Sequence, residues 1–292
     1  MILSGELVKK FVFWAYFGEK HIRKGVHMKN IINNVVGGRY YVLKKIGSGG
    51  HSDVYKVRDV YLGTFFAMKR YITSDPANKD SLLEGMEKEL NVLKHCSHPV
   101  LPKIFNVIKE DENFFLIMEY VKGINLKEYV EKNGCMKKKM LKNIMEQVCS
   151  GLYYLHSLEK PVIYRDLKPS NIILNDDGRI KLIDFGIAKR YSRDVVDELA
   201  VGSRGFAAPE QYGDTKGVGL FNTDIRTDIY GIGATMYYLC TKTTYKTDVH
   251  SFRVRGKTKR IIKKCTEIDP NKRYQDCIEV LCEIKSLHNI GK

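Results

Sequence analysis

The chain has 292 residues, of which 43% are hydrophobic, so it is long enough to bury one large core or two lobes. Lys and Arg number 49 against 34 Asp and Glu, and the formal net charge of +15 favours anionic partners such as nucleotides, acidic proteins, nucleic acids or anionic lipids. The sequence contains no run of about 18 apolar residues, which excludes a helix that crosses a bilayer by itself.

Cysteine usage indicates the redox environment. The seven cysteines are scattered, odd in number and without a Cys-x-x-Cys pair. They are Cys96, Cys135, Cys149, Cys240, Cys265, Cys277 and Cys282. This usage is typical of reduced thiols and predicts a cytoplasmic protein.

Residues 1–38 form a basic and aromatic N-terminal extension. An apolar run begins at Phe11, ends at Phe17 and is flanked by lysines and an arginine. Its length and the lack of a small-residue cleavage site after it argue against a secretion signal. Three interpretations stay open: peripheral contact with a membrane or docking to a partner, a helix packed on the domain that follows, or translation that really starts at Met28.

From Tyr40 the pattern changes to short alternating apolar runs with glycines between them, which is typical of strands joined by hairpins. Strands are predicted at residues 40–46, 54–57, 64–71, 104–108 and 114–118. Apolar residues at helical spacing predict a helix over 81–94 that packs on this sheet. Helices dominate from Leu126 onward and are predicted at 138–157, 227–240, 258–265 and 274–284.

A glycine-rich string lies between the first two predicted strands, where backbone N–H groups could cover phosphates. It consists of Ile46, Gly47, Ser48, Gly49, Gly50, His51, Ser52, Asp53 and Val54. A plain hairpin turn explains such a string equally well. The string is therefore evidence for a phosphate-binding loop only together with Lys69, which lies on the next apolar strand, two residues after Ala67.

Two further strings carry carboxylates and a carboxamide. The first, YRDLKPSN, covers residues 164–171, and the second, DFG, covers 184–186. Taken alone, each acid is more simply a loop residue or a helix cap. The oxygen atoms of Asn171 and Asp184 nevertheless suit Mg²⁺, which prefers oxygen ligands.

These strings, in this order, resemble the motif set of the eukaryotic-type protein kinases, from about Tyr40 to about Ile284. The resemblance implies an α+β, bilobal protein-kinase fold over residues 39–290. A small antiparallel-β lobe with one main helix would cover 39–119, and a larger, mostly helical lobe would cover 122–290. The implied activity is transfer of the γ-phosphate of ATP to Ser or Thr hydroxyls of an unidentified protein substrate, with Mg²⁺, or alternatively Mn²⁺.

The resemblance implies a role for each polar residue of these strings. Asp166 would accept or orient the proton of the substrate hydroxyl, and Lys168 would neutralise charge on the γ-phosphate. Asn171 and Asp184 would be the metal ligands.

The same resemblance implies how the nucleotide is held. Lys69 would grip the α- and β-phosphates and form an ion pair with Glu89. Met118 would be the gatekeeper of the adenine pocket. The full set of expected nucleotide contacts is the glycine-rich string together with Ala67, Lys69, Met118, Glu119 and Val121.

The chain departs from the family pattern at two positions. Ser52 stands at the third glycine position of the glycine-rich string. Tyr164 stands where the family usually has histidine, and we expect its ring to fill a comparable space and link the catalytic loop to Phe185.

The segment 184–210 would be the activation segment, whose phosphate the family binds through the arginine that corresponds to Arg165. It contains no threonine. Ser192 is the candidate phosphorylation site, and the alternative is activation without phosphorylation, with Asp194 or Asp197 as the local anion. Ser203 is expected to be a structural contact to the catalytic loop.

Two structural contacts follow from the resemblance. Glu210 should pair with Arg273, and Asp228 should hold the catalytic-loop backbone from a buried helix start, because a buried carboxylate needs such hydrogen bonds. Lys168 followed by Pro169 and Ser170 resembles the serine/threonine class. The dipeptides at 164–165 and 210–211 look like bacterial, Firmicutes-like members.

Competing interpretations are a kinase-like pseudoenzyme that binds nucleotide or acts as a scaffold, a nucleic-acid-binding protein and a small-molecule kinase. The first is disfavoured because Lys69, Asp166, Asn171 and Asp184 are all present. The second lacks a recognition motif, so no specific nucleic acid is expected. The basic region 241–260 would contact an acidic substrate or lipid, or else be a solvated basic face.

Overall fold

The computed structural model describes residues 31–49, 52–71, 79–110, 113–191, 201–212, 222–246 and 254–287. These residues divide into two compact units: unit 1 lies within Met1–Leu82 and Ile104–Tyr120, and unit 2 within Leu83–Lys103 and Val121–Lys292. Some sequence predictions fall outside the described residues, namely those on the run from Phe11 to Phe17, Gly50, His51, Ser192, Asp194 and Asp197.

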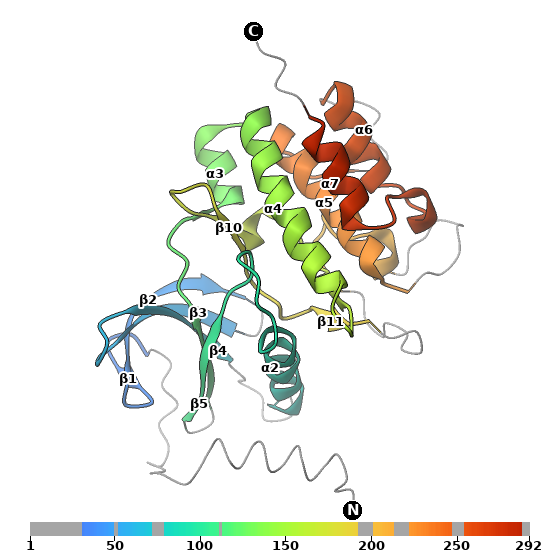
Figure 1. The fold of residues 1–292 in the computed structure, drawn as a ribbon. Helices are drawn as coiled ribbons and strands as arrows, with labels where there is room; N and C mark the ends of the chain where they lie inside the picture. The colour runs from blue at the N-terminus through green and yellow to red at the C-terminus, as the bar shows by residue number, and fades with distance from the viewer. Residues whose placement is uncertain are drawn as a thin grey trace, which may run out of the picture. The chain divides into compact units, whose positions relative to one another are not determined.

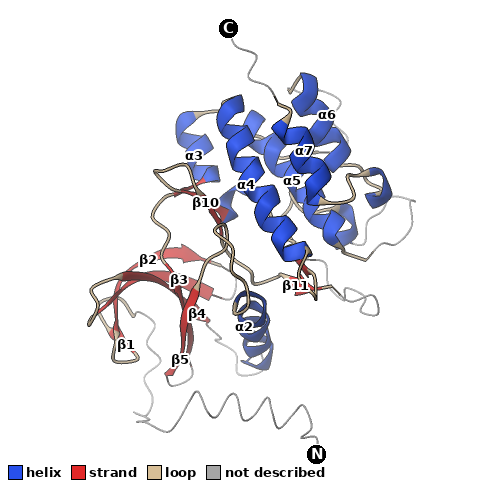
Figure 2. Ribbon diagram, in the orientation of Figure 1, coloured by secondary structure: helices blue, strands red, loops and turns tan. Residues whose placement is uncertain are grey.

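Unit 1 is built on a sheet. Its described residues form six antiparallel strands in the order β1-β2-β3-β4-β6-β5. Figures 1 and 2 label β1 to β5 of this sheet. The strands are β1 (Val35–Val36), β2 (Tyr40–Ser48), β3 (Ser52–Asp59), β4 (Phe65–Tyr71), β5 (Ile104–Glu110) and β6 (Asn113–Glu119). All five strands predicted from alternating apolar residues are confirmed. Four of them extend beyond at least one predicted end, and β4 begins one residue later than predicted, at Phe65.

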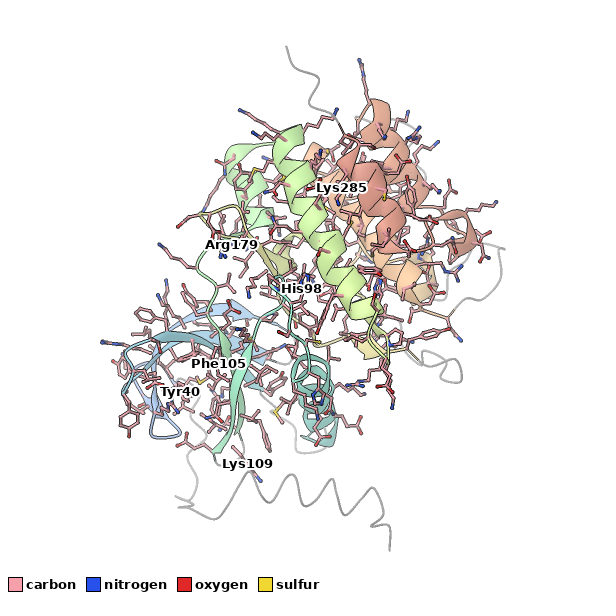
Figure 3. All side chains as sticks on the ribbon, in the orientation of Figure 1. Tyr40, His98, Phe105, Lys109, Arg179 and Lys285 are labelled. Carbon is pink, nitrogen blue, oxygen red and sulfur yellow. The ribbon has the colours of Figure 1, made fainter. Side chains whose placement is uncertain are left out.

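One face of this sheet carries the core of unit 1. Its buried members include Val42, Val57, Met68 and Ile117, which come from four different strands. Aromatic rings continue the packing, because Phe66 lies edge-on to Tyr40 at 5.9 Å and to Phe105 at 4.9 Å between ring centroids. Edge-on geometry at such distances is one of the two favoured arrangements for aromatic pairs (Figure 3 labels Tyr40 and Phe105).

Unit 2 is mostly helical. Its helices are α3 (Leu126–Asn133), α4 (Lys138–His156), α5 (Ile225–Thr241), α6 (Gly256–Cys265) and α7 (Cys277–Lys285), together with most of α2 (Lys79–Leu93). Its described residues also form short strands: β7 (Ile124–Asn125), β9 (Ile172–Leu174) and β10 (Ile180–Leu182) in one sheet, and β8 (Val162–Ile163) and β11 (Lys189–Arg190) in another. The predicted bilobal, antiparallel-β plus helical architecture is confirmed.

Helix α5 lies at the centre of unit 2, and nearly all its residues are buried. It begins with a capping box, in which Asp224 accepts a backbone hydrogen bond and Thr227 reaches back to the backbone of Asp224. A Cβ on Gly233 would lie 2.5 Å from the Cβ of Cys265, so this glycine allows α6 to pack closely. Helices α4 and α7 pack along each other, as Figure 1 shows.

No helix among the described residues is long and apolar enough to cross a membrane. All seven cysteines lie in the described ranges, and each is free.

Candidate active site

In unit 2, Asp166 and Lys168 of the catalytic loop, residues 164–171, form a closed hydrogen-bond triangle with Ser203. Lys168 Nζ lies 2.7 Å from Asp166 Oδ2 and donates to Ser203 Oγ at 2.6 Å. Ser203 Oγ donates to Asp166 Oδ1 at 2.8 Å. The prediction that Ser203 contacts the catalytic loop is therefore confirmed, and both carboxylate oxygens of Asp166 are oriented by fixed donors.

Asn171 supports Asp166 from within the same loop. Its amide nitrogen donates to the Asp166 carbonyl at 3.0 Å and to Asp166 Oδ2 at 2.8 Å. It lies in a short 3-10 helix, η2 (Pro169–Asn171), that follows Lys168. Because the amide nitrogen faces Asp166, the amide oxygen is the atom that could serve a cation.

Asp228, in the first turn of α5, holds the start of the catalytic loop. Its carboxylate accepts from the backbone N–H of Tyr164 at 2.8 Å and of Arg165 at 2.7 Å, which confirms the predicted contact. His156 Nε2, at the end of α4, lies 2.8 Å from the same carboxylate.

Arg165 has a φ of 64°, a left-handed conformation that is unfavourable for a residue with a Cβ. The Asp228 hydrogen bonds help to hold the chain in this conformation.

Tyr164 occupies the position of the usual histidine and joins two strings of the site. Its hydroxyl donates to the Ile183 carbonyl, and its ring lies edge-on to Phe185 at 4.9 Å. Burial first, and then the charges of Asp166 and Asp184, raise the pKa of the Tyr164 hydroxyl well above its ordinary value. The hydroxyl is therefore a stable hydrogen-bond donor, and the expected link between the catalytic loop and Phe185 is confirmed.

Asn171 and Asp184 are joined through the backbone. The N–H of Ile183, the residue before Asp184, donates to the Asn171 carbonyl at 2.9 Å. Asp184 has a φ of 65°, and its Oδ1 accepts from Gly186 N–H at 3.3 Å. Carboxylate and amide oxygens at this junction fit a hard cation such as Mg²⁺. Across the described ranges no group of three or more His, Cys, Asp or Glu gathers. Two side chains cannot fill the octahedral shell that Mg²⁺ prefers, so phosphate oxygens or water would complete the coordination of a cation at Asn171 and Asp184.

Arg165 reaches the start of the activation segment. Its Nε donates to the Ile187 carbonyl at 2.7 Å. The segment continues as β11, which pairs with β8, and Tyr191 N–H donates to the Pro161 carbonyl at 2.7 Å.

Glu210 and Arg273 form the predicted buried ion pair. Arg273 Nη1 lies 2.7 Å from Glu210 Oε1, and Nη2 lies 2.8 Å from Oε2, so the pairing is bidentate. Thr227 Oγ1 donates to the same carboxylate at 2.9 Å. The side chains of Arg273 and Glu210 are 1% exposed or less, which makes this pair a fixed anchor for the end of the activation segment.

In unit 1 the described residues of the glycine-rich string lie at the paired ends of β2 and β3. Gly47 pairs with Val54, and the turn closes with a hydrogen bond of 2.7 Å from Gly49 N–H to the Ser52 carbonyl. Burial raises the pKa of the Asp53 carboxyl, but hydrogen bonds from Lys45 and Ser48 outweigh it and hold that pKa below its ordinary value.

The remaining expected nucleotide contacts of unit 1 lie on neighbouring strands. Lys69 on β4 pairs with Val54 on β3, and its side chain is buried. Ala67 on the same strand pairs with Met118 on β6. The sheet therefore brings the predicted phosphate lysine beside the end of the hairpin, and the predicted gatekeeper beside Ala67.

Two expected nucleotide-site residues, Glu89 and Val121, belong to unit 2. Glu89 is 1% exposed on α2, and such burial requires partners for its carboxylate. The ion pair between Lys69 and Glu89, and the contact of Val121 with the nucleotide, stay predictions.

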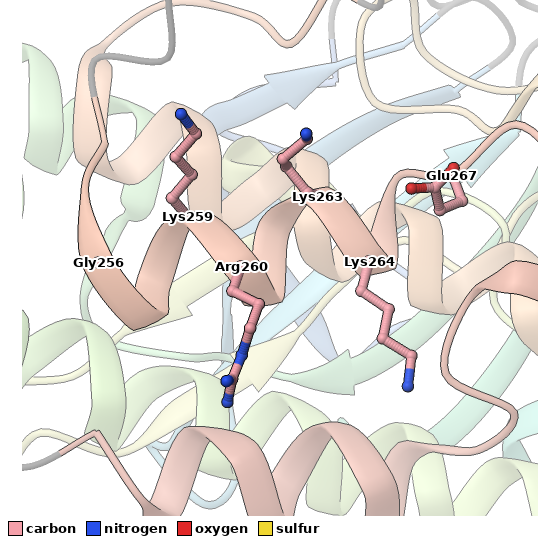
Figure 4. Close-up of a pocket in the computed structure, with 6 residues that line it drawn as sticks. All are labelled: Gly256, Lys259, Arg260, Lys263, Lys264 and Glu267. Carbon is pink, nitrogen blue, oxygen red and sulfur yellow. The ribbon is translucent and has the colours of Figure 1, made fainter.

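A hollow of about 400 Å³ lies along α6, away from the catalytic motifs in sequence (Figure 4). Its lining residues are Gly256, Lys259, Arg260, Lys263, Lys264 and Glu267. Several cations of α6 already have partners within unit 2. Arg260 and Lys257 contact the Glu283 carboxylate at 3.0 and 3.4 Å, and Lys264 Nζ lies 4.1 Å from the Tyr274 ring centroid. Both interpretations of the region 241–260, contact with an acidic substrate or lipid and a solvated basic face, stay predictions.

Residues 40–286 of the chain match the protein kinase domain family, and the chain therefore belongs to that family. The predicted resemblance is confirmed.

Particular relatives support the bacterial likeness. Serine/threonine-protein kinase PrkC of Bacillus subtilis is 34% identical over 213 residues, which are 72% of this chain and 32% of that protein. Serine/threonine-protein kinase B of Synechocystis sp. is 32% identical over 273 residues, 84% of this chain and 46% of that protein. Serine/threonine-protein kinase D of the same organism is 30% identical over 283 residues, 87% of this chain and 53% of that protein. The chain thus spans about a third to a half of the length of these curated relatives.

Sequence reasoning missed two polar residues of the site, His156 and Gln211. His156 contacts Asp228 across 72 positions, and Gln211 contacts Arg165 across 46 positions. The sequence offered only a histidine in the last turn of a helix and a glutamine directly after Ala-Pro-Glu at residues 208–210. Neither pattern reveals a partner so far along the chain.

Proposed function

We propose that the chain is a serine/threonine protein kinase that transfers the γ-phosphate of ATP to hydroxyls of a protein substrate. The observation that carries this proposal is the fixed orientation of the Asp166 carboxylate by Lys168, Ser203 and Asn171. The names of the relatives, all serine/threonine-protein kinases, support the same activity.

In the proposed reaction, the substrate hydroxyl oxygen attacks the γ-phosphorus and the bond to the bridging oxygen of ADP breaks. Asp166 orients the hydroxyl and accepts its proton as the new bond forms. Lys168, 2.7 Å from Asp166, neutralises negative charge on the transferred phosphoryl group. Lys69 holds the α- and β-phosphates, as the family pattern implies.

Asn171 and Asp184 are the proposed ligands of Mg²⁺, or alternatively Mn²⁺, which would neutralise phosphate charge when bound. Their placement on adjacent backbone, linked by the hydrogen bond from Ile183 to Asn171, supports this role. The expected nucleotide contacts in the glycine-rich string and at Ala67, Met118, Glu119 and Val121 belong to the same proposal.

The alternative is a non-catalytic binding module, which the departures from the family pattern at Ser52 and Tyr164 would favour. The contacts of Tyr164 with Ile183 and Phe185 weaken that support, since the tyrosine keeps the catalytic loop attached to the Asp-Phe-Gly string.

The decisive experiment is phosphate transfer from γ-labelled ATP with Mg²⁺ to the protein itself and to a generic basic protein substrate. Asp166→Asn should abolish the transfer, and label in the wild type should reside on serine or threonine. The matched control is Asp176→Asn, because the Asp176 side chain is 87% exposed. Saturable ATP binding without any transfer would instead favour the binding module or a missing activator.

The role of the run from Phe11 to Phe17 also stays a proposal. Peripheral contact of a cytoplasmic protein with anionic lipid, or docking to a partner, is the first option. Packing on the kinase domain is the second, and translation that really starts at Met28 is the third. Flotation with anionic liposomes of the full chain and of a variant lacking residues 1–38 separates lipid contact from the others, because only lipid contact predicts that flotation is lost with the deletion.

A further inference from the structure

Gln211 bridges two segments of unit 2 that are far apart in sequence. Its Nε2 donates to the carbonyls of Arg165 and Val201, each at 2.9 Å. Its Oε1 accepts from the Ala208 N–H, also at 2.9 Å. Gln211 is 4% exposed, so water cannot readily replace these bonds if the amide is removed.

Both carbonyls lie next to the groups that orient Asp166. Arg165 immediately precedes Asp166, and Val201 lies two residues before Ser203, whose hydroxyl donates to Asp166 at 2.8 Å. One side-chain amide therefore fixes the backbone carbonyl of the residue before Asp166. It also fixes the carbonyl of Val201, in the segment that carries Ser203.

Gly202 provides the space that this amide needs. Its φ is 125°, and a Cβ at this position would lie 2.7 Å from Gln211 Nε2 and 2.6 Å from the Cβ of Ala207. A residue with a Cβ at this position would collide with the amide and would strain the backbone. The glycine and the glutamine are thus matched to each other.

The backbone of Gln211 is itself fixed. It lies in the short 3-10 helix η3 (Pro209–Tyr212), in which Glu210 makes the buried bidentate pair with Arg273. The Tyr212 hydroxyl donates to the Gly202 carbonyl at 3.2 Å. The amide therefore acts from a rigid support and cannot follow the two segments if they drift apart.

We propose that Gln211 is a positioning residue that couples the segment carrying Gly202 and Ser203 to the alignment of Asp166. The inference rests on the proposed phosphotransfer function. Gln211 touches none of the reacting groups itself; it acts through the backbone of Arg165 and Val201.

Gln211→Glu is the sharpest variant, because it keeps the shape of the side chain. The Ala208 N–H retains an acceptor, but the ionised carboxylate has no donor and turns an oxygen towards both carbonyls. We expect kcat to fall by roughly tenfold to a hundredfold, since small misplacement of a reacting group has effects of this size. KM for ATP should stay within about twofold, because the lost contact does not bind nucleotide.

The matched control is Gln147→Glu. Gln147 Nε2 donates to the Gly178 carbonyl at 2.9 Å, and its Oε1 accepts from the Ile180 N–H at 3.0 Å. It thus makes the same kind of bridge, but to a turn that contacts neither Asp166 nor Ser203. We expect this variant to lower the melting temperature without the loss in kcat.

The pH profile separates positioning from mere support of the fold. A protonated glutamic acid regains one O–H donor, and its pKa should be raised because its charged form faces carbonyl oxygens. The ratio of kcat for Gln211→Glu to that of the wild type should therefore rise as pH falls from 8 to 6. The same ratio for Gln147→Glu should stay flat.

An unchanged kcat in a folded Gln211→Glu protein, or an equal loss in Gln147→Glu, would overturn the proposal.

If the wild type transfers no phosphate, the proposed function fails, and amide hydrogen exchange then decides whether Gln211 couples the two segments. Gln211→Met should speed exchange both in residues 162–171 and in residues 201–212, while α7 keeps its protection. Exchange at the wild-type rate in either segment would show that the amide does not couple them.

Discussion

The hydroxyl of Tyr164 donates a hydrogen bond to the backbone carbonyl of Ile183, and so ties the start of the catalytic loop to the residue before Asp184. Both residues belong to unit 2, and Tyr164 is fully buried. This bond depends on a neutral phenol, which the raised pKa of Tyr164 preserves.

We expect Tyr164→Phe to remove this hydrogen bond while it keeps the ring against Phe185. The Ile183 carbonyl would then lose a buried donor, which costs about 1–3 kcal/mol in the free energy of unfolding. Urea denaturation measures this loss. Tyr153→Phe is the control, because the Tyr153 ring is 44% exposed, and an equal effect at both positions would contradict the proposed importance of the bond.

Ser203→Ala should lower kcat by roughly tenfold, because Asp166 Oδ1 loses its donor and Lys168 loses an acceptor. The steady-state kinetics of phosphate transfer would show the loss, with KM for ATP nearly unchanged. Ser157→Ala removes a comparable hydroxyl whose bond goes to the exposed Tyr153 carbonyl. A similar kcat for Ser203→Ala and the wild type would mean that Lys168 and Asn171 suffice to orient Asp166.

Much of the fold could be predicted from the sequence because its strands and long helices carry strong periodicity. Other elements are too short to show a period, such as β7 with two residues and β9 with three. The apolar spacing predicts helix α7 from residue 274, but the helix begins at Cys277 because the Asp276 side chain accepts from the Glu279 N–H and caps the helix there. The predicted packing of the helix 81–94 on the sheet stays a prediction, since most of α2 groups with unit 2.

The candidate site could be predicted as a set of residues but not as a network. The order of the strings identifies Asp166, Asn171 and Asp184 by their resemblance to the family. It does not show that Gln211 reaches the Arg165 carbonyl or that His156 reaches Asp228, because these bonds depend on how distant segments pack. The pairing of Glu210 with Arg273 was foreseen only because the family pattern implied it.

Arg273→Met should destabilise the protein by about 3–5 kcal/mol, because it leaves the buried Glu210 carboxylate without its countercharge. The free energy of unfolding in urea measures the effect. The double variant Glu210→Gln with Arg273→Met should be less destabilised than Arg273→Met alone, since it removes the orphaned charge.

Arg179→Met is the matched surface control for this prediction. Arg179 pairs with Asp177 at 2.6 Å, but its side chain is 78% exposed, so its loss should cost less than about 1 kcal/mol. Equal costs at Arg273 and Arg179 would show that the buried pair is not an anchor.

Stability should fall as pH rises above the ordinary thiol pKa of about 8.5. Burial, with a smaller effect of Cys135, raises the pKa of the Cys240 thiol to about 12, and burial also raises the pKa of Cys149 and Cys277. Between these pH values the unfolded chain releases thiol protons that the folded chain retains. The free energy of unfolding should therefore decline by up to about 1.4 kcal/mol per pH unit for each such thiol.

Urea denaturation at pH 7.5 and 9.5, with a reducing agent present, tests this expectation. Cys240→Ala should make the decline less steep, because one retained proton is removed from the folded state. Cys282→Ala, at an exposed thiol, is the matched control for the substitution itself. A wild-type free energy that is equal at the two pH values would show that the buried thiols ionise as easily in the folded protein as in the unfolded chain.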